Sequence, residues 1–153
     1  MDSTHQQPDG SSNHKAGAAF ELAAFNYLRG LGLSLHRKFK FPVGAGGSTK
    51  LKEFDLGSQS PLILVECKKH TWTRGQKRSN PSAKMAAWNE ALFYFSLIRA
   101  PAQKILFVLR HTNPRTGVSL ADHYFKSYSH LIAPDVEIWE FDDTSLTHRV
   151  IKP

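Results

Sequence analysis

The chain has 153 residues, of which 41% are hydrophobic, and it carries a net charge of +7 at pH 7. A chain of this size forms one domain with a core, and its single cysteine, Cys67, excludes an intrachain disulfide. No stretch approaches the roughly 18 apolar residues of a membrane span, so we expect an intracellular protein, cytoplasmic and nucleoid-associated, whose basic charge attracts a polyanion.

The first half of the chain predicts a helix followed by three strands. Residues 1–14 are polar, and we expect a disordered tail there, followed by one domain over 15–153. Apolar residues at helical spacing predict a helix over 15–31, with Phe20, Ala24, Tyr27 and Leu31 on one stripe. Three strands in a meander are then expected, over 33–41, 50–56 and 61–69.

The second half predicts a mixed β-sheet flanked by helices, which is an α/β fold. A basic loop over 71–82 leads to a long helix over 82–98, followed by a strand over 104–111, a helix over 120–132 and a strand over 136–141. The third strand, the long helix and the fourth strand make a crossover unit, so these two strands should be parallel. The long helix is apolar nearly all round, and its part around 85–98 is a candidate homodimer contact.

Acidic residues are scarce in the basic part of the chain, and two predicted strands carry three of them. Strand alternation places Glu66 and Lys68 on one face, about 7 Å apart, at the end of the third strand. Glu53 and Asp55 share a face of the second strand, and Asp55 reaches the face of Glu66 only if the strand bends or bulges. Two converging carboxylates suit a hard cation such as Mg²⁺. The pattern leaves open whether Asp55 or Glu53 is the ligand.

Asp55, followed by Glu66-Cys67-Lys68 after a hydrophobic strand, resembles the PD-(D/E)XK nuclease superfamily, which has the restriction-endonuclease-like fold. The stretch GAAFELAAFNYLRGLGLSLHRKF is similar to the first helix and strand of Holliday junction resolvase-like members, and it places Glu21 where these have a glutamate. The resemblance covers about residues 16–112. It implies an αβββαβ core, to which this chain adds a C-terminal helix and strand.

The resemblance also implies an activity, namely metal-dependent hydrolysis of phosphodiester bonds. By this resemblance Asp55, Glu66 and Glu21 would be ligands of Mg²⁺ or Mn²⁺, together with the backbone carbonyl of Cys67, and Lys68 would position the attacking water. We therefore expect an endonuclease that cuts DNA, with RNA as the alternative substrate. The chain is too short for a separate base-reading domain, which favours structure-selective or weakly sequence-specific cutting.

Basic residues around this motif are the candidate nucleic-acid contacts, because lysine and arginine position phosphates without reading sequence. They are Lys50, Lys52, Lys69, Arg74, Lys77, Arg78 and Lys84. Trp72 in the basic loop either stacks on an unpaired base or packs over the edge of the core. Two alternatives remain open: a non-cleaving nucleic-acid-binding module with the same fold, and a basic scaffold for an acidic protein.

Overall fold

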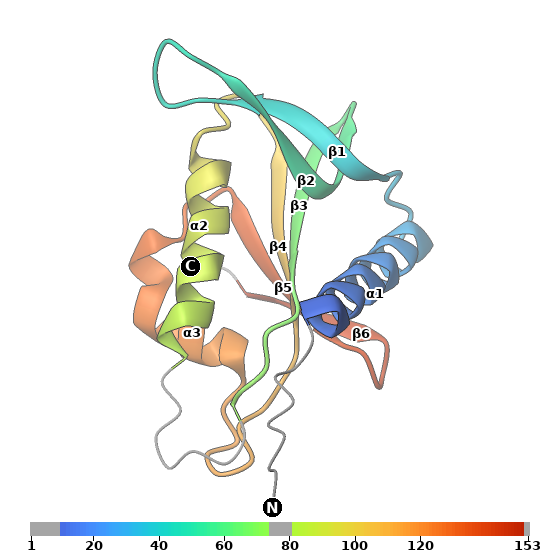
Figure 1. The fold of residues 1–153 in the computed structure, drawn as a ribbon, viewed down its shortest axis with the longest axis vertical. Helices are drawn as coiled ribbons and strands as arrows, with labels where there is room; N and C mark the ends of the chain where they lie inside the picture. Colours follow the sequence, from blue (N-terminus) through green and yellow to red (C-terminus); the bar gives the residue numbers. More distant parts are fainter. Residues whose placement is uncertain (1–9, 74–80, 152–153) are drawn as a thin grey trace, which may run out of the picture.

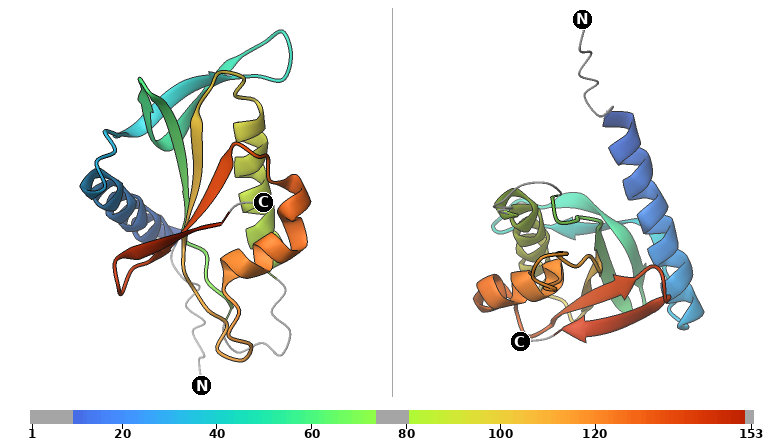
Figure 2. Two further views of the ribbon diagram at one scale, coloured as in Figure 1. Left: turned by 180° about the vertical axis from the view of Figure 1, so that it is seen from behind. Right: turned by 90° about the horizontal axis from the view of Figure 1, so that it is seen from below.

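A computed structural model describes residues 10–73 and 81–151 as a mixed α/β fold (Figures 1 and 2). Six strands form one sheet in the order β1-β2-β3-β4-β5-β6. The helix α1 lies on one face of the sheet, and α2 and α3 lie on the other. The elements are α1 (Gly10–Gly30), β1 (His36–Val43), β2 (Lys50–Gln59), β3 (Leu62–Lys68), α2 (Ser82–Ser96), β4 (Gln103–Leu109), α3 (Leu120–Tyr128), η1 (Ser129–Leu131), β5 (Val136–Asp142) and β6 (Thr147–Ile151).

The strand pairing confirms the expected mixed sheet. The first three strands form an antiparallel meander, β3 and β4 are parallel across the α2 crossover, and β4 and β5 are also parallel. The antiparallel strand β6 was not predicted. The helix α1 begins at Gly10, within the tail expected to be disordered, while residues 1–9 lie outside the described part. Among the described helices, none combines the length and the apolar character that a membrane crossing requires.

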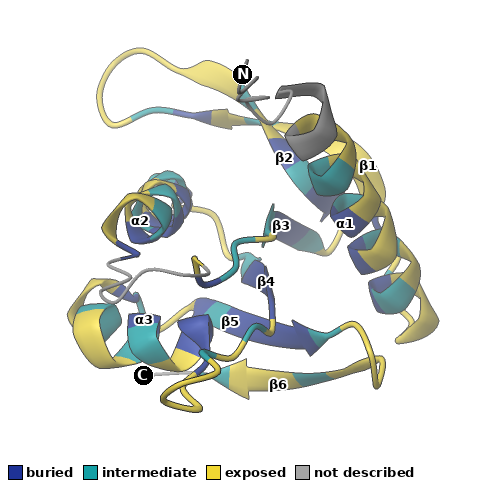
Figure 3. Ribbon diagram, turned by 60° about the horizontal axis from the view of Figure 1, so that its bottom comes forward, coloured by how far each residue is buried: buried dark blue, intermediate teal, exposed yellow. Residues whose placement is uncertain are grey.

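Apolar side chains fill both faces of the sheet, which explains the uninterrupted apolar run of β3. Leu64 packs toward α2 and α3, while Val65 packs toward α1, so successive residues enter different cores. Figure 3 shows the buried residues running along β4 and β5 between the helices. The predicted stripe of α1 was wrong at Leu31, which is 49% exposed because the helix ends at Gly30.

Most of α2 serves the core of the protein. Met85, Trp88, Ala91, Leu92 and Phe95 are buried beneath the helix, because their spacing matches the helical repeat. Its outward face carries Phe93, which is 59% exposed. A homodimer contact through residues 85–98 therefore stays a prediction, with Phe93 as its apolar side chain.

The strands β2 and β3 diverge at one end, and this fork positions the residues of interest. Their paired residues run from Gln59 and Leu62 to Leu56 and Val65, where the regular pairing ends. Phe54 packs toward α2 whereas Leu56 packs toward α1, although residues two apart in a flat strand share a face. The strand therefore bends at Asp55, as its convergence with Glu66 requires.

The neighbouring strand β1 is distorted at the same level. Its regular pairs with β2 include Arg37 with Leu56 and Phe39 with Phe54, which leaves Lys38 opposite Asp55. Lys38 has a φ of 54°, the left-handed region that non-glycine residues rarely occupy. Backbone strain of this kind is concentrated at functional sites, which draws attention to this level of the sheet.

Gly57, beside the bend, packs too closely for any side chain. A Cβ at this position would lie 2.4 Å from the Phe39 ring and 2.8 Å from the backbone oxygen of Ile63. Gly57→Ala should therefore lower the free energy of unfolding by about 1–3 kcal/mol, as measured by urea denaturation. Gly46→Ala is the matched control, because nothing lies within 4 Å of its Cβ position. Equal midpoints for the two variants would contradict the close packing at Gly57.

Candidate active site

The carboxylate of Asp55 lies in the fork between β2 and β3. Its Oδ2 accepts a hydrogen bond of 2.7 Å from the backbone N–H of Cys67, which a continued ladder with β2 would otherwise satisfy. The side chain thus replaces a strand partner and is fixed by the backbone of β3. The bend in β2 is therefore what brings this acid from the second strand to the end of the third.

Glu66 is a buried carboxylate next to Asp55. The residue is only 6% exposed, and its Oε1 lies 3.1 Å from the Lys52 ammonium nitrogen. Apart from this ion pair, the described residues make no hydrogen bond to Oε1. Burial and then the charge of Asp55 raise the pKa of Glu66 to about 7, against the opposing charges of Lys52 and Lys68. A buried carboxylate that can be ionised favours a positive charge beside it, here the Lys52 ammonium and in a loaded site a metal cation.

Glu21 approaches the same fork from α1, which covers the face of the sheet opposite to α2 and α3. Its pKa is raised by burial first, then by the charge of Asp55 and a side-chain hydrogen bond to it. Arg37 and Lys38 of β1 act in the opposite direction on this pKa. Burial, and after it the charge of Asp55, therefore makes both Glu21 and Glu66 harder to ionise than free glutamate.

The site fits a cation that takes few protein ligands. Within residues 10–73 and 81–151 there is no group of three or more His, Cys, Asp or Glu side chains able to hold a metal ion. Mg²⁺ normally takes one or two carboxylates and completes its shell with water and substrate phosphate. Asp55 and the carboxylate of Glu66, whose Oε1 faces the Lys52 ammonium, match this requirement. The expected contributions of Glu21 and of the Cys67 carbonyl stay predictions.

Two other candidates near the fork take no part in this arrangement. Glu53, the rival of Asp55, is exposed and pairs across the sheet with Lys40. Its charge is not a cause of the raised pKa of Glu21 or Glu66, whereas that of Asp55 is. The Cys67 thiol points to the α1 side, and burial raises its pKa well above the ordinary value, so it is a poor nucleophile.

Two lysines flank Glu66, and the sequence had assigned only one of them to the site. Lys68, at the end of β3, is half-buried and acts on Glu66 through its charge. Lys52 was expected to contact phosphates, but its ammonium is paired with Glu66 and lies 4.5 Å from the ring centroid of Tyr94. Cation–π contact and the ion pair together hold it inside the site. Lys52 lies on the same face of the sheet as Glu66. The alternation of side chains along a regular strand would place them on different faces, and the bend in β2 reverses this.

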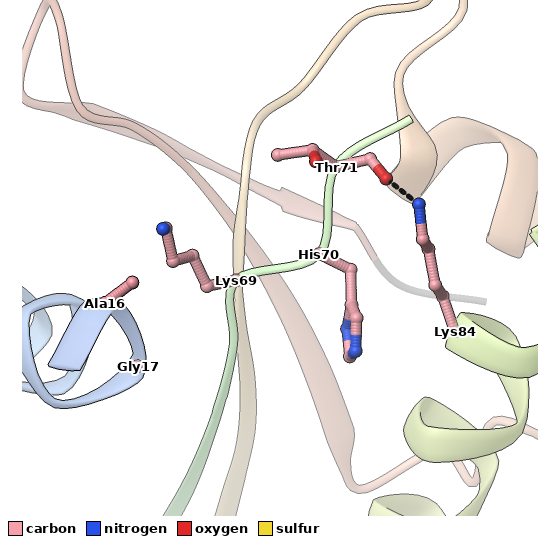
Figure 4. Close-up of a pocket in the computed structure, with 6 residues that line it drawn as sticks. All are labelled: Ala16, Gly17, Lys69, His70, Thr71 and Lys84. Atoms are coloured by element: carbon pink, nitrogen blue, oxygen red, sulfur yellow. Dashed lines mark hydrogen bonds between the residues drawn. The ribbon is translucent and has the colours of Figure 1, made fainter. Parts of the chain in front are cut away.

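A cleft of about 500 Å³ opens beyond the end of β3 (Figure 4). Its lining residues come from α1, the segment after β3, and α2: Ala16, Gly17, Lys69, His70, Thr71 and Lys84. The Lys84 ammonium donates to the backbone oxygen of Thr71 and, over 3.0 Å, to the Thr73 hydroxyl. Of the predicted phosphate contacts, Lys69 and Lys84 therefore lie together at the cleft.

The other predicted nucleic-acid residues are spread more widely. Lys50 is exposed at the start of β2, about 17 Å along the strand from Asp55. Arg74, Lys77 and Arg78 lie outside the described residues. Sequence reasoning missed Arg37 and Lys38, although the basic run HRK at the start of β1 was a signal for them.

Trp72 packs over the edge of the core, so stacking on a base finds no support in its position. It is only 8% exposed, and its indole nitrogen donates to the backbone oxygen of Val118 over 3.1 Å. Its ring also meets His123 edge-on, with 5.3 Å between ring centroids.

The fork therefore combines fixed and buried carboxylates with lysines from adjacent strands. Such a set can hold a divalent cation against a phosphate and stabilise the charge that develops when the phosphate is attacked. A scan against protein-family models, a search of curated proteins and a search of solved structures each found no match for this chain.

Proposed function

We propose that this chain is a metal-dependent nuclease of the PD-(D/E)XK type that hydrolyses phosphodiester bonds in DNA. The observation that carries the proposal is the fork, where the Cys67 amide fixes Asp55 beside the buried carboxylate of Glu66, which is paired with Lys52. The element order α1-β1-β2-β3-α2-β4 supports a restriction-endonuclease-like core. The remaining elements, α3, η1, β5 and β6, extend that core at one edge of the sheet.

The residues of the fork divide the chemistry among them. Asp55 and Glu66 would hold Mg²⁺ or Mn²⁺, which supplies positive charge toward the phosphate and lowers the pKa of water when bound. Lys68 places an ammonium next to these carboxylates, where it orients the attacking water and stabilises charge on the phosphate. Glu21 retains a proton more readily than free glutamate, because its pKa is raised, and it sits where it can exchange that proton with Asp55.

The substrate follows from the charges around the fork. Lys69 at the cleft and Arg37 and Lys38 on β1 would contact phosphates on both sides of the scissile bond, while Lys84 holds the cleft wall through Thr71 and Thr73. Contacts of this kind position a backbone without reading bases, so we propose structure-selective or weakly specific cutting. DNA is the proposed partner, in the cytoplasm and on the nucleoid, with RNA as the alternative.

A plasmid-nicking assay tests the proposal. Supercoiled DNA should become nicked or linear with Mg²⁺ or Mn²⁺ and stay intact with EDTA, because the paired carboxylates need the cation to approach a phosphate. RNA of matched length in a parallel reaction decides between the two substrates. Intact plasmid at every metal concentration would contradict the proposed activity.

One observation favours a second function, a non-cleaving nucleic-acid-binding module. Lys52 already neutralises Glu66 in the metal-free protein, and a site satisfied in this way does not need a cation. The module would bind DNA equally well with EDTA or Mg²⁺ and would not nick plasmid. The nuclease would nick plasmid and depend on the cation.

A further inference from the structure

The cleft beyond β3 is continuous in sequence with the candidate active site. Lys68 ends β3, and the next three residues, Lys69, His70 and Thr71, line the cleft. Figure 4 shows α1, with Ala16 and Gly17, on one side of this segment and Lys84 of α2 on the other. A nucleic-acid strand with its scissile phosphate at the fork would therefore place a neighbouring nucleotide at the cleft.

The described lining of the cleft is cationic. It contains two ammonium groups and no carboxylate, so it favours an anion. Lys84 is tied to Thr71 and Thr73, whereas the exposed Lys69 directs its nitrogen toward α1 (Figure 4) and makes no ion pair with the described residues. Lys69 is therefore the group available to a phosphate, and Lys84 holds the wall in place.

His70 adds a neutral donor with a fixed tautomer. The indole N–H of Trp88 donates to His70 Nδ1 over 3.0 Å. An indole N–H only donates, so Nδ1 carries no proton and the neutral ring carries its proton on Nε2. Trp88 is fully buried, so the ring is anchored to the core while Nε2–H remains for a ligand at the cleft wall.

The size of the cleft matches a single nucleotide better than a duplex. Its volume of about 500 Å³ lies in the range of pockets that enclose small ligands. A base pair with its two backbones is too wide for such a space, whereas enzymes that act on an extruded or unpaired nucleotide enclose it in pockets of this kind.

We propose that this cleft binds one unpaired nucleotide of the substrate strand, next to the scissile phosphate. Lys69 Nζ contacts a phosphate oxygen, and His70 Nε2–H donates to a second acceptor on the same nucleotide. The inference rests on the proposed nuclease function and deepens it, since it names single-stranded or frayed DNA as the substrate class.

Fluorescence polarisation in EDTA tests this inference separately from cleavage. The probes are a labelled single strand of about 12 nucleotides, a usual site size for strand-binding proteins, and the blunt duplex of the same sequence. Forms of the single strand with a 5′-phosphate or a 5′-hydroxyl distinguish an end phosphate from an internal one. A loss of affinity in Lys69→Ala for either form that exceeds the loss for the duplex supports the proposal.

Two variants and one control make the test specific. Lys69→Ala removes the phosphate contact, and His70→Asn removes the Nε2 donor while its amide oxygen still accepts from Trp88. Each should weaken single-strand binding about five- to tenfold, the effect of losing one charge-assisted or directed hydrogen bond, with duplex binding nearly unchanged. Arg99→Ala is the control, because Arg99 is exposed beyond the opposite end of α2.

The outcomes separate this inference from the proposed function. Unchanged single-strand affinity, or equal losses for single strand and duplex, would overturn the cleft as a nucleotide site while leaving any nicking activity in place. A selective loss for the single strand would support the cleft even if the plasmid assay showed no cleavage. Melting curves of each variant establish that a loss reflects the missing group and not an unfolded protein.

Discussion

Glu66→Gln is expected to lower metal-dependent cleavage by about 10³-fold and to stabilise the metal-free protein at pH 8. The loss of cleavage follows because glutamine has no negative charge to hold a divalent cation against the phosphate. The gain in stability follows because the wild-type protein must bury an ionised carboxylate beside Asp55 at that pH. A substitution that lowers activity but raises stability indicates that the carboxylate of Glu66 serves the reaction and not the stability of the fold.

The pKa of Glu66 defines the pH range of the stability effect. The ordinary value is 4.5, and the folded protein raises it to about 7. Between these values the folded state keeps a proton that the unfolded chain has lost, so stability falls as the pH rises through this window. The fall in the stability of the wild type is at most about 3 kcal/mol. In Glu66→Gln the Lys52 ammonium loses its ionic partner, which makes the gain in stability of this variant smaller.

Urea denaturation in EDTA at pH about 5 and pH about 8 measures this effect. The difference in unfolding free energy between Glu66→Gln and wild type should be larger at the higher pH. Glu53→Gln is the matched control, since Glu53 is exposed on the adjacent strand and should follow wild type at both values. A difference that does not change with pH would show that Glu66 ionises normally in the folded protein.

Lys68→Met is expected to lower the single-turnover cleavage rate by about 10²–10⁴-fold, the usual contribution of a group that handles a proton or developing charge. DNA binding in EDTA should change little, because Lys68 acts at the reacting phosphate. Lys52→Met should keep cleavage within about tenfold of wild type, since a bound cation takes over the charge that Lys52 supplies to Glu66.

Lys52→Met serves as the matched comparison because both lysines influence Glu66. Its ammonium lies 3.1 Å from Oε1, so its removal should also increase the rise in melting temperature that Mn²⁺ produces. The two variants are compared at saturating Mn²⁺ by rapid quench. A greater loss of rate in Lys52→Met than in Lys68→Met would assign the water-positioning role to Lys52.

Much of the sheet could be predicted because local patterns determine it. The apolar run of β3 indicated a strand covered on both faces, and the helix after it required the parallel pairing with β4. The strand β6 escaped prediction because Thr147–Ile151 has no buried residue and lacks an apolar pattern. Existence and order of elements follow from side-chain spacing, whereas weak edge strands depend on their neighbours.

The site was less accessible to sequence reasoning than the fold. The motif drew attention to Asp55 and Glu66, but the bend that brings them together depends on where β2 and β3 separate. The ion pair of Lys52 depends on the same bend, so it was hidden until the register was known. Trp72 donates to the backbone oxygen of Val118, which is distant in sequence, and Lys84 donates to that of Thr71 across a loop. No local sequence pattern indicates either contact.

The bond that fixes Asp55 comes from a main-chain amide, and this has a consequence for tolerance to change at position 67. Every amino acid except proline supplies the same N–H, so the anchor is indifferent to the side chain beside it. The thiol itself only fills space toward α1. A compact apolar replacement there would leave the acid in place, which allows the lone thiol to be removed from preparations that must resist oxidation.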